Sequence, residues 1–207
     1  MFKLIKPAIL LTLLLTVLCG LAYPLAMTGV AKALFPDQAR GSLIVRNGHV
    51  VGSRLIGQNF DAPWYFHPRP SATTAPDPKN PAQQVPAPYN AASSNASNAA
   101  PTAKGLIQDV GARIAALLLA NPRANRPIPV DLVTASGSGL DPDISPAAAE
   151  FQVPRVAAAR GVSANEIRKL VFAATRARTF GLFGEARVNV LELNLELDDH
   201  YPMATKK

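Results

Sequence analysis

The feature that most constrains the fold of this chain is an apolar run near its N-terminus, residues 7–34. Between Pro7 and Ala31 the run contains no charged residue. About 25 helical residues reach about 37 Å, which is enough to cross a hydrocarbon core of about 30 Å. A core helix of a soluble domain rarely stays apolar on all faces over such a length. The run therefore predicts one membrane-spanning helix over residues 7–34, preceded by a short basic N-terminus at residues 1–6.

Two kinds of targeting segment also contain apolar runs, and neither matches this one. A cleaved signal peptide has an apolar core of about 7–15 residues, which is shorter. A lipoprotein signal places a small residue before the modified cysteine, whereas Leu18 precedes Cys19 here. Inside the run, Pro24 lacks a backbone N–H and crowds the preceding turn, so a kink is expected near Leu21–Pro24.

Positive charges flank the run on both sides. Lys3 and Lys6 precede it, and Lys32, Arg40 and Arg46 follow it. A very short basic N-terminus before a first span usually stays in the cytoplasm. We therefore expect the N-terminus inside and the rest of the chain outside the cytoplasm.

The remainder of the chain is long enough for one ordinary domain, which we place at residues 35–198 with a tail at residues 199–207. The only cysteine, Cys19, lies in the apolar run, so the domain has neither a disulfide nor a cysteine-based metal site. The net charge of +7 suits anionic lipid or an acidic partner surface. The basic residues are not interleaved with aromatic residues as in nucleic-acid-binding proteins, so no nucleic-acid partner is expected.

The first part of the domain predicts a hairpin, a long loop and a helix. Ser42–Phe60 is expected to form the β-hairpin, because β-forming residues flank the turn pair Asn47-Gly48. Thr73–Ala103 has a low-complexity composition and predicts a loop that touches the domain at Tyr89-Asn90. Lys104–Ala120 has the apolar spacing of an amphipathic helix. Trp64, Tyr65 and Phe66 lie before the loop and are expected to cover the core or a partner.

The second part predicts helices and a C-terminal strand. Ile128–Val133 is expected to be a short strand or extended segment. Pro154 divides the next region into two short helices, Pro146–Gln152 and Pro154–Arg160. Ser163-Ala-Asn-Glu166 is a capping box that begins a further helix. In Arg187–Leu197, alternating Leu with polar residues predicts a half-buried strand with a bulge near Val190. These elements together predict an α+β domain behind one transmembrane helix.

Few residues form a pattern that carries chemistry. Ser136-Gly137-Ser138-Gly139 could direct backbone N–H groups at a phosphate, but no Lys-Ser/Thr follows as in a P-loop. Ser136 and Leu140 occupy the positions where a nucleophile elbow needs glycine. A tight structural loop is the simpler interpretation.

The remaining titratable residues favour structural roles. His49, His67 and His200 do not have the spacing of metal ligands. Asp141 and Asp143 could bind a cation together with Ser145, but Pro142 stiffens the loop and the ligands are too few. Glu192 and Glu196 match a solvated strand face better than a catalytic pair. Five arginines make the helical region basic, and a solvated or salt-bridged face explains them better than a ligand clamp: Arg155, Arg160, Arg168, Arg176 and Arg178.

Several segments resemble the small C subunit of the bacterial Kdp-type potassium-transporting P-type ATPase, and the resemblance covers nearly the whole chain. They are VGSRLIGQNF (Val51–Phe60), YFHPRPSA (Tyr65–Ala72), Tyr89-Asn90, PVDLVTASGSGLDPDISPAAAEFQVPRVAAARG (Pro129–Gly161) and RVNVLELNLEL (Arg187–Leu197). One segment departs from the family. Residues 91–105 carry Ala and Ser where the family has a glycine-rich turn, so the geometry of any partner contact there differs.

The resemblance implies a single-pass accessory subunit of a bacterial inner membrane, without catalytic residues or a cofactor of its own. The family assembles with a channel-like potassium-translocating subunit and a P-type ATP-hydrolysing subunit, and is described as a catalytic chaperone that raises the pump's affinity for ATP. The resemblance also suggests residues linked to nucleotide binding, which in this sequence are Ser136, Gly137, Ser138, Gly139 and Gln152. A domain outside the cytoplasm would not meet cytoplasmic ATP, so direct ATP contact is the alternative hypothesis. An anchored hydrolase using Ser138 is a third hypothesis, for which the sequence places no base.

Overall fold

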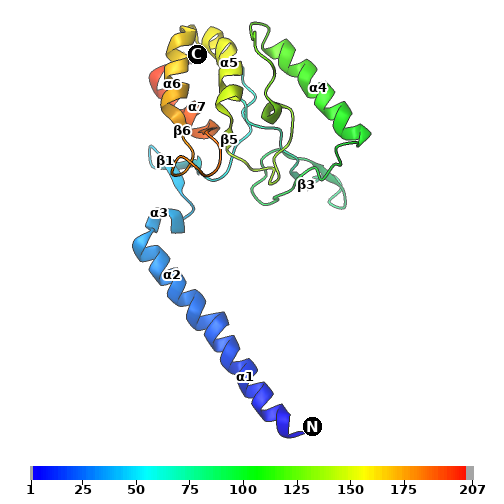
Figure 1. Ribbon diagram of the computed structural model, residues 1–207, viewed down its shortest axis with the longest axis vertical. Helices are drawn as coiled ribbons and strands as arrows, with labels where there is room; N and C mark the ends of the chain where they lie inside the picture. Colours follow the sequence, from blue (N-terminus) through cyan, green and yellow to red (C-terminus); the bar gives the residue numbers. More distant parts are fainter. Residues whose placement is uncertain (1, 204–207) are drawn as a thin grey trace. The chain divides into compact units, whose positions relative to one another are not determined.

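The computed structural model describes residues 2–203, which form two compact units, residues 2–53 and 54–203. The predicted tail therefore lies partly outside the described residues. Each unit is built from its own local elements (Figure 1). The α+β fold class, with one long apolar N-terminal helix, is confirmed.

The first unit is dominated by the apolar helix. A 3-10 turn at Phe2–Leu4 leads into α1 (Ile5–Val17), a π-helical turn (Leu18–Ala22) and α2 (Tyr23–Leu34). These segments form one helical stretch of 30 residues, Ile5–Leu34, the one candidate membrane span among the described residues. No residue of its most apolar window is buried by the chain itself. This helix can therefore serve as a single membrane span, and its π-helical turn ends just before Pro24, close to the position of the predicted kink.

The predicted hairpin is confirmed in the first unit, but it is shorter than expected. After the short helix α3 (Pro36–Ala39), β1 (Leu43–Arg46) pairs antiparallel with β2 (His49–Ser53). Asn47 and Gly48 have φ angles of 51° and 77°, which matches the tight turn that their sequence predicts. Pairing ends at Ser53 rather than Phe60.

The second unit combines helices with small antiparallel sheets. One sheet pairs β3 with β4, and the other has the order β5-β7-β6. Figure 1 shows α5 and α6 side by side, with α4 at one edge of the unit. The elements are β3 (Thr74–Pro76), β4 (Gln84–Pro86), α4 (Lys104–Ala120), a 3-10 turn (Val130–Leu132), β5 (Asp143–Ile144), α5 (Pro146–Arg160), α6 (Ala164–Ala174), β6 (Thr175–Arg176), β7 (Arg187–Asn189) and α7 (Val190–His200).

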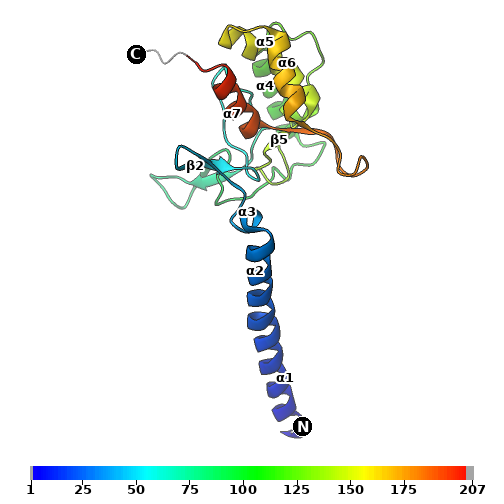
Figure 2. The same cartoon turned by 90° about the vertical axis from the view of Figure 1, so that its left-hand side faces the viewer.

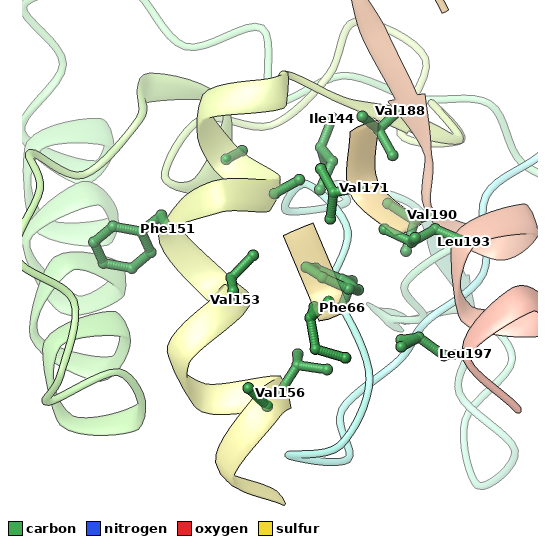
Figure 3. Packing of buried hydrophobic residues seen from close by; sticks show 14 of the residues in the cluster. Phe66, Ile144, Phe151, Val153, Val156, Val171, Val188, Val190, Leu193 and Leu197 are labelled. Atoms are coloured by element: carbon green, nitrogen blue, oxygen red, sulfur yellow. The ribbon is translucent and has the colours of Figure 1, made fainter. Parts of the chain in front are cut away.

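The core of this unit lies between α5, α6 and α7. Phe66 is completely buried and lies between side chains of α5 and α7, as Figure 3 shows. Around it pack Val153 and Val156 from α5 and Leu193 and Leu197 from α7. The aromatic segment, which we define as Pro63–His67, thus contributes a central core residue although it belongs to no helix or strand.

Two predicted helices are in fact one. α5 runs from Pro146 to Arg160 with Pro154 inside it, so the predicted break at Pro154 is wrong. The fixed φ angle of proline is compatible with a helix, and its cost is one lost hydrogen bond and local crowding. Burial of Val153 and Val156 on either side of Pro154 offsets that cost, because both side chains are inaccessible to solvent.

The predicted C-terminal strand is mostly a helix. Only Arg187–Asn189 forms a strand, and α7 begins at Val190, so the expected bulge is absent. The Asn189 side chain accepts a hydrogen bond from the Glu192 N–H and caps the helix. Its buried residues have helical spacing: Val190, Leu191, Leu193, Asn194 and Leu197.

Three local predictions have mixed outcomes. The helix Lys104–Ala120 has the predicted bounds. The capping box at Ser163 is present and begins α6. Val130–Leu132 is a 3-10 turn, so a strand at Ile128–Val133 is wrong. The low-complexity loop contains the β3–β4 pair, which the sequence did not predict.

Candidate functional site

The SGSG loop, Ser136–Gly139, is held closed by its own side chains. The Ser136 hydroxyl accepts a hydrogen bond from the Gly139 N–H at 2.9 Å. The Ser138 hydroxyl accepts one from the Leu140 N–H at 3.1 Å. These two backbone donors, which a phosphate cradle would present to an anion, are therefore occupied within the loop.

Two carbonyl groups of the loop are also engaged, in this case by residues 71–95. The Ser138 carbonyl accepts from the Asn95 N–H at 2.9 Å and from the Ser94 hydroxyl at 3.1 Å. The Gly139 carbonyl accepts from the Ser71 hydroxyl at 2.7 Å. The SGSG loop thus fastens residues 71–95 to the domain.

Two glycines make this close approach possible. Gly139 has a φ angle of 69°, and a Cβ atom there would lie 2.6 Å from the Asn95 carbonyl oxygen. A Cβ atom on Gly57 would lie 2.4 Å from Tyr89 Cε1 and 2.8 Å from the Asp141 carbonyl oxygen. Both positions need glycine for space, and Gly139 needs it for backbone conformation as well.

Tyr89 confirms the expected contact between the long loop and the domain. Its hydroxyl donates to the Arg69 carbonyl at 2.8 Å, and its N–H donates to the Ser71 hydroxyl at 3.0 Å. Burial and the Asp141 carboxylate raise the pKa of Tyr89. The phenol therefore stays neutral and acts as a hydrogen-bond donor.

Gln152, the fifth nucleotide-linked candidate, lies in a different network. It is completely buried on α5. Its Oε1 accepts from the His67 N–H at 2.8 Å, and its Nε2 donates to the His67 carbonyl at 3.1 Å. Oε1 also accepts from Arg155 Nη2 at 2.7 Å. Gln152 therefore pairs with the backbone of His67 much as a neighbouring strand would, and its described hydrogen bonds do not reach the SGSG loop.

Asn194 on α7 repeats this arrangement at the adjacent residue. Its Oδ1 accepts from the Phe66 N–H at 2.8 Å, and its Nδ2 donates to the Phe66 carbonyl at 2.9 Å. Two buried amide side chains, from α5 and α7, thus satisfy two consecutive backbone residues. This pairing lets an irregular segment enter the core without unpaired polar groups.

Two arginines of α5 bind the rest of the aromatic segment. Arg155 Nη1 donates to the carbonyls of Pro63 and Tyr65 at 2.5 and 2.9 Å. Arg160 Nε donates to the Trp64 carbonyl at 2.8 Å, and its Nη2 bonds Asp198 at 2.9 Å. Burial lowers the pKa of Arg155 to about 10, so it remains charged at neutral pH.

The other arginines confirm the salt-bridge interpretation, whereas Arg155 departs from it because its hydrogen bonds go to carbonyl and amide oxygens. Arg168 pairs with Glu150 at 2.7 Å, Arg178 with Glu185 at 2.6 Å, and Arg176 with Glu192. Because α7 is a helix, Glu192 and Glu196 do not lie on a strand face as predicted. Glu196 instead lies one turn before His200, with 3.6 Å between the Glu196 carboxylate and His200 Nδ1.

The acidic residues near β5 serve as partners for the fold. Asp141 pairs with Arg69 at 3.0 Å, and Asp143 pairs with Arg187 at 3.1 Å. Asp131, which the sequence did not single out, accepts from the Ser145 N–H at 2.7 Å. They line a cavity of about 590 Å³. Within residues 2–203, no three His, Cys, Asp or Glu side chains are grouped so that they could hold a metal ion.

His67 makes the stability of the second unit depend on pH. Its Nε2 lies 3.0 Å from the Ala62 carbonyl and donates to it. Burial and the nearby Arg155 charge lower the pKa of His67 below 6.5. The unfolded chain then binds a proton more readily than the folded chain, so the free energy of unfolding should fall as pH drops below about 6.5.

This decrease in the free energy of unfolding at low pH can be measured by the fluorescence of Trp64, the only tryptophan in the sequence. Unfolding of the detergent-solubilised chain should need less urea at pH 5.5 than at pH 7.5. The His67→Gln variant, whose amide can still donate to Ala62, should lose part of this difference. An equal difference in both proteins would show that another group titrates.

The sequence reasoning missed Asn194, Asp198 and Asn121 as binding partners. Asn121 is buried, and its Oδ1 accepts from Arg155 Nε at 3.0 Å. The one available signal was Asn194, a polar residue at a position that is apolar in a helical reading of residues 190–197. The strand interpretation assigned it to the solvent face instead.

Comparisons with known proteins show the family of this chain. The family model described as KdpC: K+-transporting ATPase, c chain, matches residues 5–199. The chain is 61% identical over 198 residues to the potassium-transporting ATPase KdpC subunit of Rhodopseudomonas palustris (strain BisB5), covering 96% of this chain and 98% of that protein. It is 58% identical to the equally named protein of Methylorubrum populi, covering 94% and 96% of the two chains. The chain therefore belongs to the KdpC family of potassium-transporting ATPase subunits, as its sequence motifs indicate, and is a single-pass membrane protein.

Proposed function

We propose that this chain is a non-catalytic accessory subunit that assembles and tunes an ATP-driven potassium import pump. The observation that carries the proposal is that the residues most suggestive of chemistry are occupied by hydrogen bonds within the fold. The side chains of Ser136, Ser138 and Gln152 accept hydrogen bonds from Gly139, Leu140 and His67 within the fold. Side chains that are engaged in internal hydrogen bonds stabilise the fold. A stable, well-defined surface is what assembly with partner subunits requires.

The proposed partners are a channel-like potassium-translocating subunit and a P-type ATP-hydrolysing subunit. The apolar helix Ile5–Leu34 buries none of its most apolar window within the chain, so lipid or neighbouring membrane helices would cover it. We place the N-terminus in the cytoplasm and the second unit outside the bacterial inner membrane. Cysteine substituted at an exposed position such as Ser94, in a Cys19→Ser background, should react with a membrane-impermeant thiol reagent on intact cells.

Within this proposal the chain acts as a catalytic chaperone, raising the affinity of the hydrolysing subunit for ATP through the assembly. The alternative is direct ATP contact through Ser136–Gly139 and Gln152. That alternative requires the second unit in the cytoplasm and an opened SGSG loop, because Gly139 and Leu140 donate within the loop. The two candidates therefore differ in topology as well as in chemistry.

Two measurements test the subunit role. An affinity tag on the detergent-extracted chain should retain two larger membrane subunits, and deleting the chain should abolish growth on micromolar potassium. Purification as a lone monomer, with normal uptake in the deletion strain, would contradict the role. Ser138→Ala should leave function intact, and loss of function with a normally folded variant would instead support hydrolase chemistry at Ser138.

A further inference from the structure

The segment between β6 and β7, residues 177–186, is a short hairpin extension with apolar side chains at its tip. The Thr179 N–H donates to the Phe183 carbonyl at 2.9 Å, and the Phe183 N–H donates to the Thr179 carbonyl at 3.0 Å. Figure 2 shows this loop in orange, extending away from the helices of the second unit. The backbone of the loop is therefore defined by its own hydrogen bonds.

The tip exposes bulky apolar surface that the chain does not cover. Phe180 is 88% exposed, Leu182 is 75% exposed and Phe183 is 67% exposed. Aromatic side chains contribute most when buried, and exposed apolar groups gathered at one point commonly mark a binding site. In the free chain these three side chains bury only a small part of their surface.

The backbone at the tip adds a second unfavourable feature. Phe180 and Gly181 have φ angles of 54° and 74°, like Asn47 and Gly48 in the β1–β2 turn. Asn and Gly adopt this conformation readily, whereas a bulky residue does so at a cost. Tyr89 also has a positive φ angle, but its hydroxyl bonds the Arg69 carbonyl. The largely exposed Phe180 ring has no comparable compensation, which points to a function for this strained residue.

The charges at the base of the loop indicate what kind of partner fits. Arg178 Nη2 contacts both carboxylate oxygens of Glu185, at 2.7 and 2.6 Å. Arg176 pairs with Glu192, and Arg187 pairs with Asp143. These positive charges are thus neutralised within the domain, so the loop lacks the unpaired basic residues that attract anionic lipid headgroups. An apolar tip surrounded at its base by ion pairs matches the usual composition of a protein–protein interface, which has an apolar centre and a polar periphery.

We propose that the tip formed by Phe180, Leu182 and Phe183 anchors this chain in an apolar pocket on one of the larger membrane subunits of its complex. The proposal rests on the assembly role proposed above and assigns that role to a defined surface. Phe180 is the central residue of the anchor, because its side chain is the most exposed of the three and its backbone conformation is costly for a bulky residue.

The test uses the full complex in detergent, captured by a tag on this chain, and follows the rate at which the larger subunits are lost on washing. Phe180→Gly and Phe180→Asn remove the ring while suiting the backbone conformation, so both variants should keep the stability of the free chain. They should release the larger subunits at least tenfold faster. Phe180→Tyr should retain them, and so should the control Leu119→Ala, which removes an equally exposed side chain from α4.

Release at the wild-type rate from both Phe180→Gly and Phe180→Asn would overturn the proposal. Quenching of the Phe180→Trp variant by bromine-labelled acyl chains would, in that case, assign the tip to the bilayer. Equal weakening by Leu119→Ala would also overturn it, because the effect would not be specific to the tip. Failure of the wild-type chain to capture any larger subunit would refute the assembly role itself, which is a distinct result.

Discussion

Replacing Gln152 with leucine is expected to lower the free energy of unfolding of the second unit by about 3 kcal/mol. The substitution leaves the half-buried His67 N–H and carbonyl without the Gln152 amide as their partner. It also removes one acceptor from the partly buried Arg155 guanidinium. A buried polar group that loses its only partner costs more than an average hydrogen bond contributes, because it was removed from water in order to make that bond.

The measurement is urea unfolding of the detergent-solubilised chain, followed by Trp64 fluorescence. Trp64 lies in the aromatic segment, so its emission reports directly on the region that Gln152 holds. Gln108→Leu, the same change at an exposed position of α4, is the control and should change stability by less than about 0.5 kcal/mol. A Gln152→Leu variant as stable as the wild type, but with weakened ATP affinity of the complex, would favour the nucleotide-linked role of Gln152.

Replacing Gly139 with alanine is expected to cost about 2–4 kcal/mol. Its φ angle of 69° is unfavourable for alanine, and the new Cβ atom would lie 2.6 Å from the Asn95 carbonyl oxygen and from Thr73 Cγ2. One of the two segments must move, so residues 71–95 should separate from the SGSG loop. Faster proteolysis within residues 77–95 would report that separation.

Gly137→Ala is a matched control two residues away in the same loop. Gly137 has no positive φ angle, and a Cβ atom there would meet nothing within 4 Å. The control should therefore remain folded and protease-resistant. If Gly137→Ala abolished pump function while Gly139→Ala did not destabilise the fold, the loop would be acting on a ligand and not on the structure.

The sequence predicts best where a structure is determined by neighbouring residues. The apolar run, the Asn47-Gly48 turn and the capping box at Ser163 each depend on a few consecutive residues, and all three are confirmed. The strand predicted over residues 187–197 is wrong because two patterns coincide there. Alternate residues are apolar, namely Leu191, Leu193, Leu195 and Leu197, but the same segment also has apolar residues at helical spacing. The Asn189 cap and the packing of Leu193 and Leu197 against Phe66 decide in favour of the helix.

The hydrogen bonds around the aromatic segment could not be predicted, because they join residues far apart in the chain. Gln152 and His67 are 85 positions apart, and Asn194 and Phe66 are 128 positions apart. Neither pair leaves a local pattern in the sequence. For the SGSG loop, the sequence favours a tight structural loop over a phosphate cradle, and the hydrogen bonds within the loop confirm it. The contacts of this loop with Ser94 and Asn95 join distant parts of the chain and could not be predicted.

We propose that this chain tunes a pump and has no turnover of its own. The most direct test is ATP hydrolysis by the purified potassium-stimulated complex across a range of ATP concentrations, with and without this chain. We predict no hydrolysis by the chain alone, and a lower half-saturating ATP concentration when the chain is present. Hydrolysis by the isolated chain, or identical ATP curves for the complex with and without it, would contradict the account.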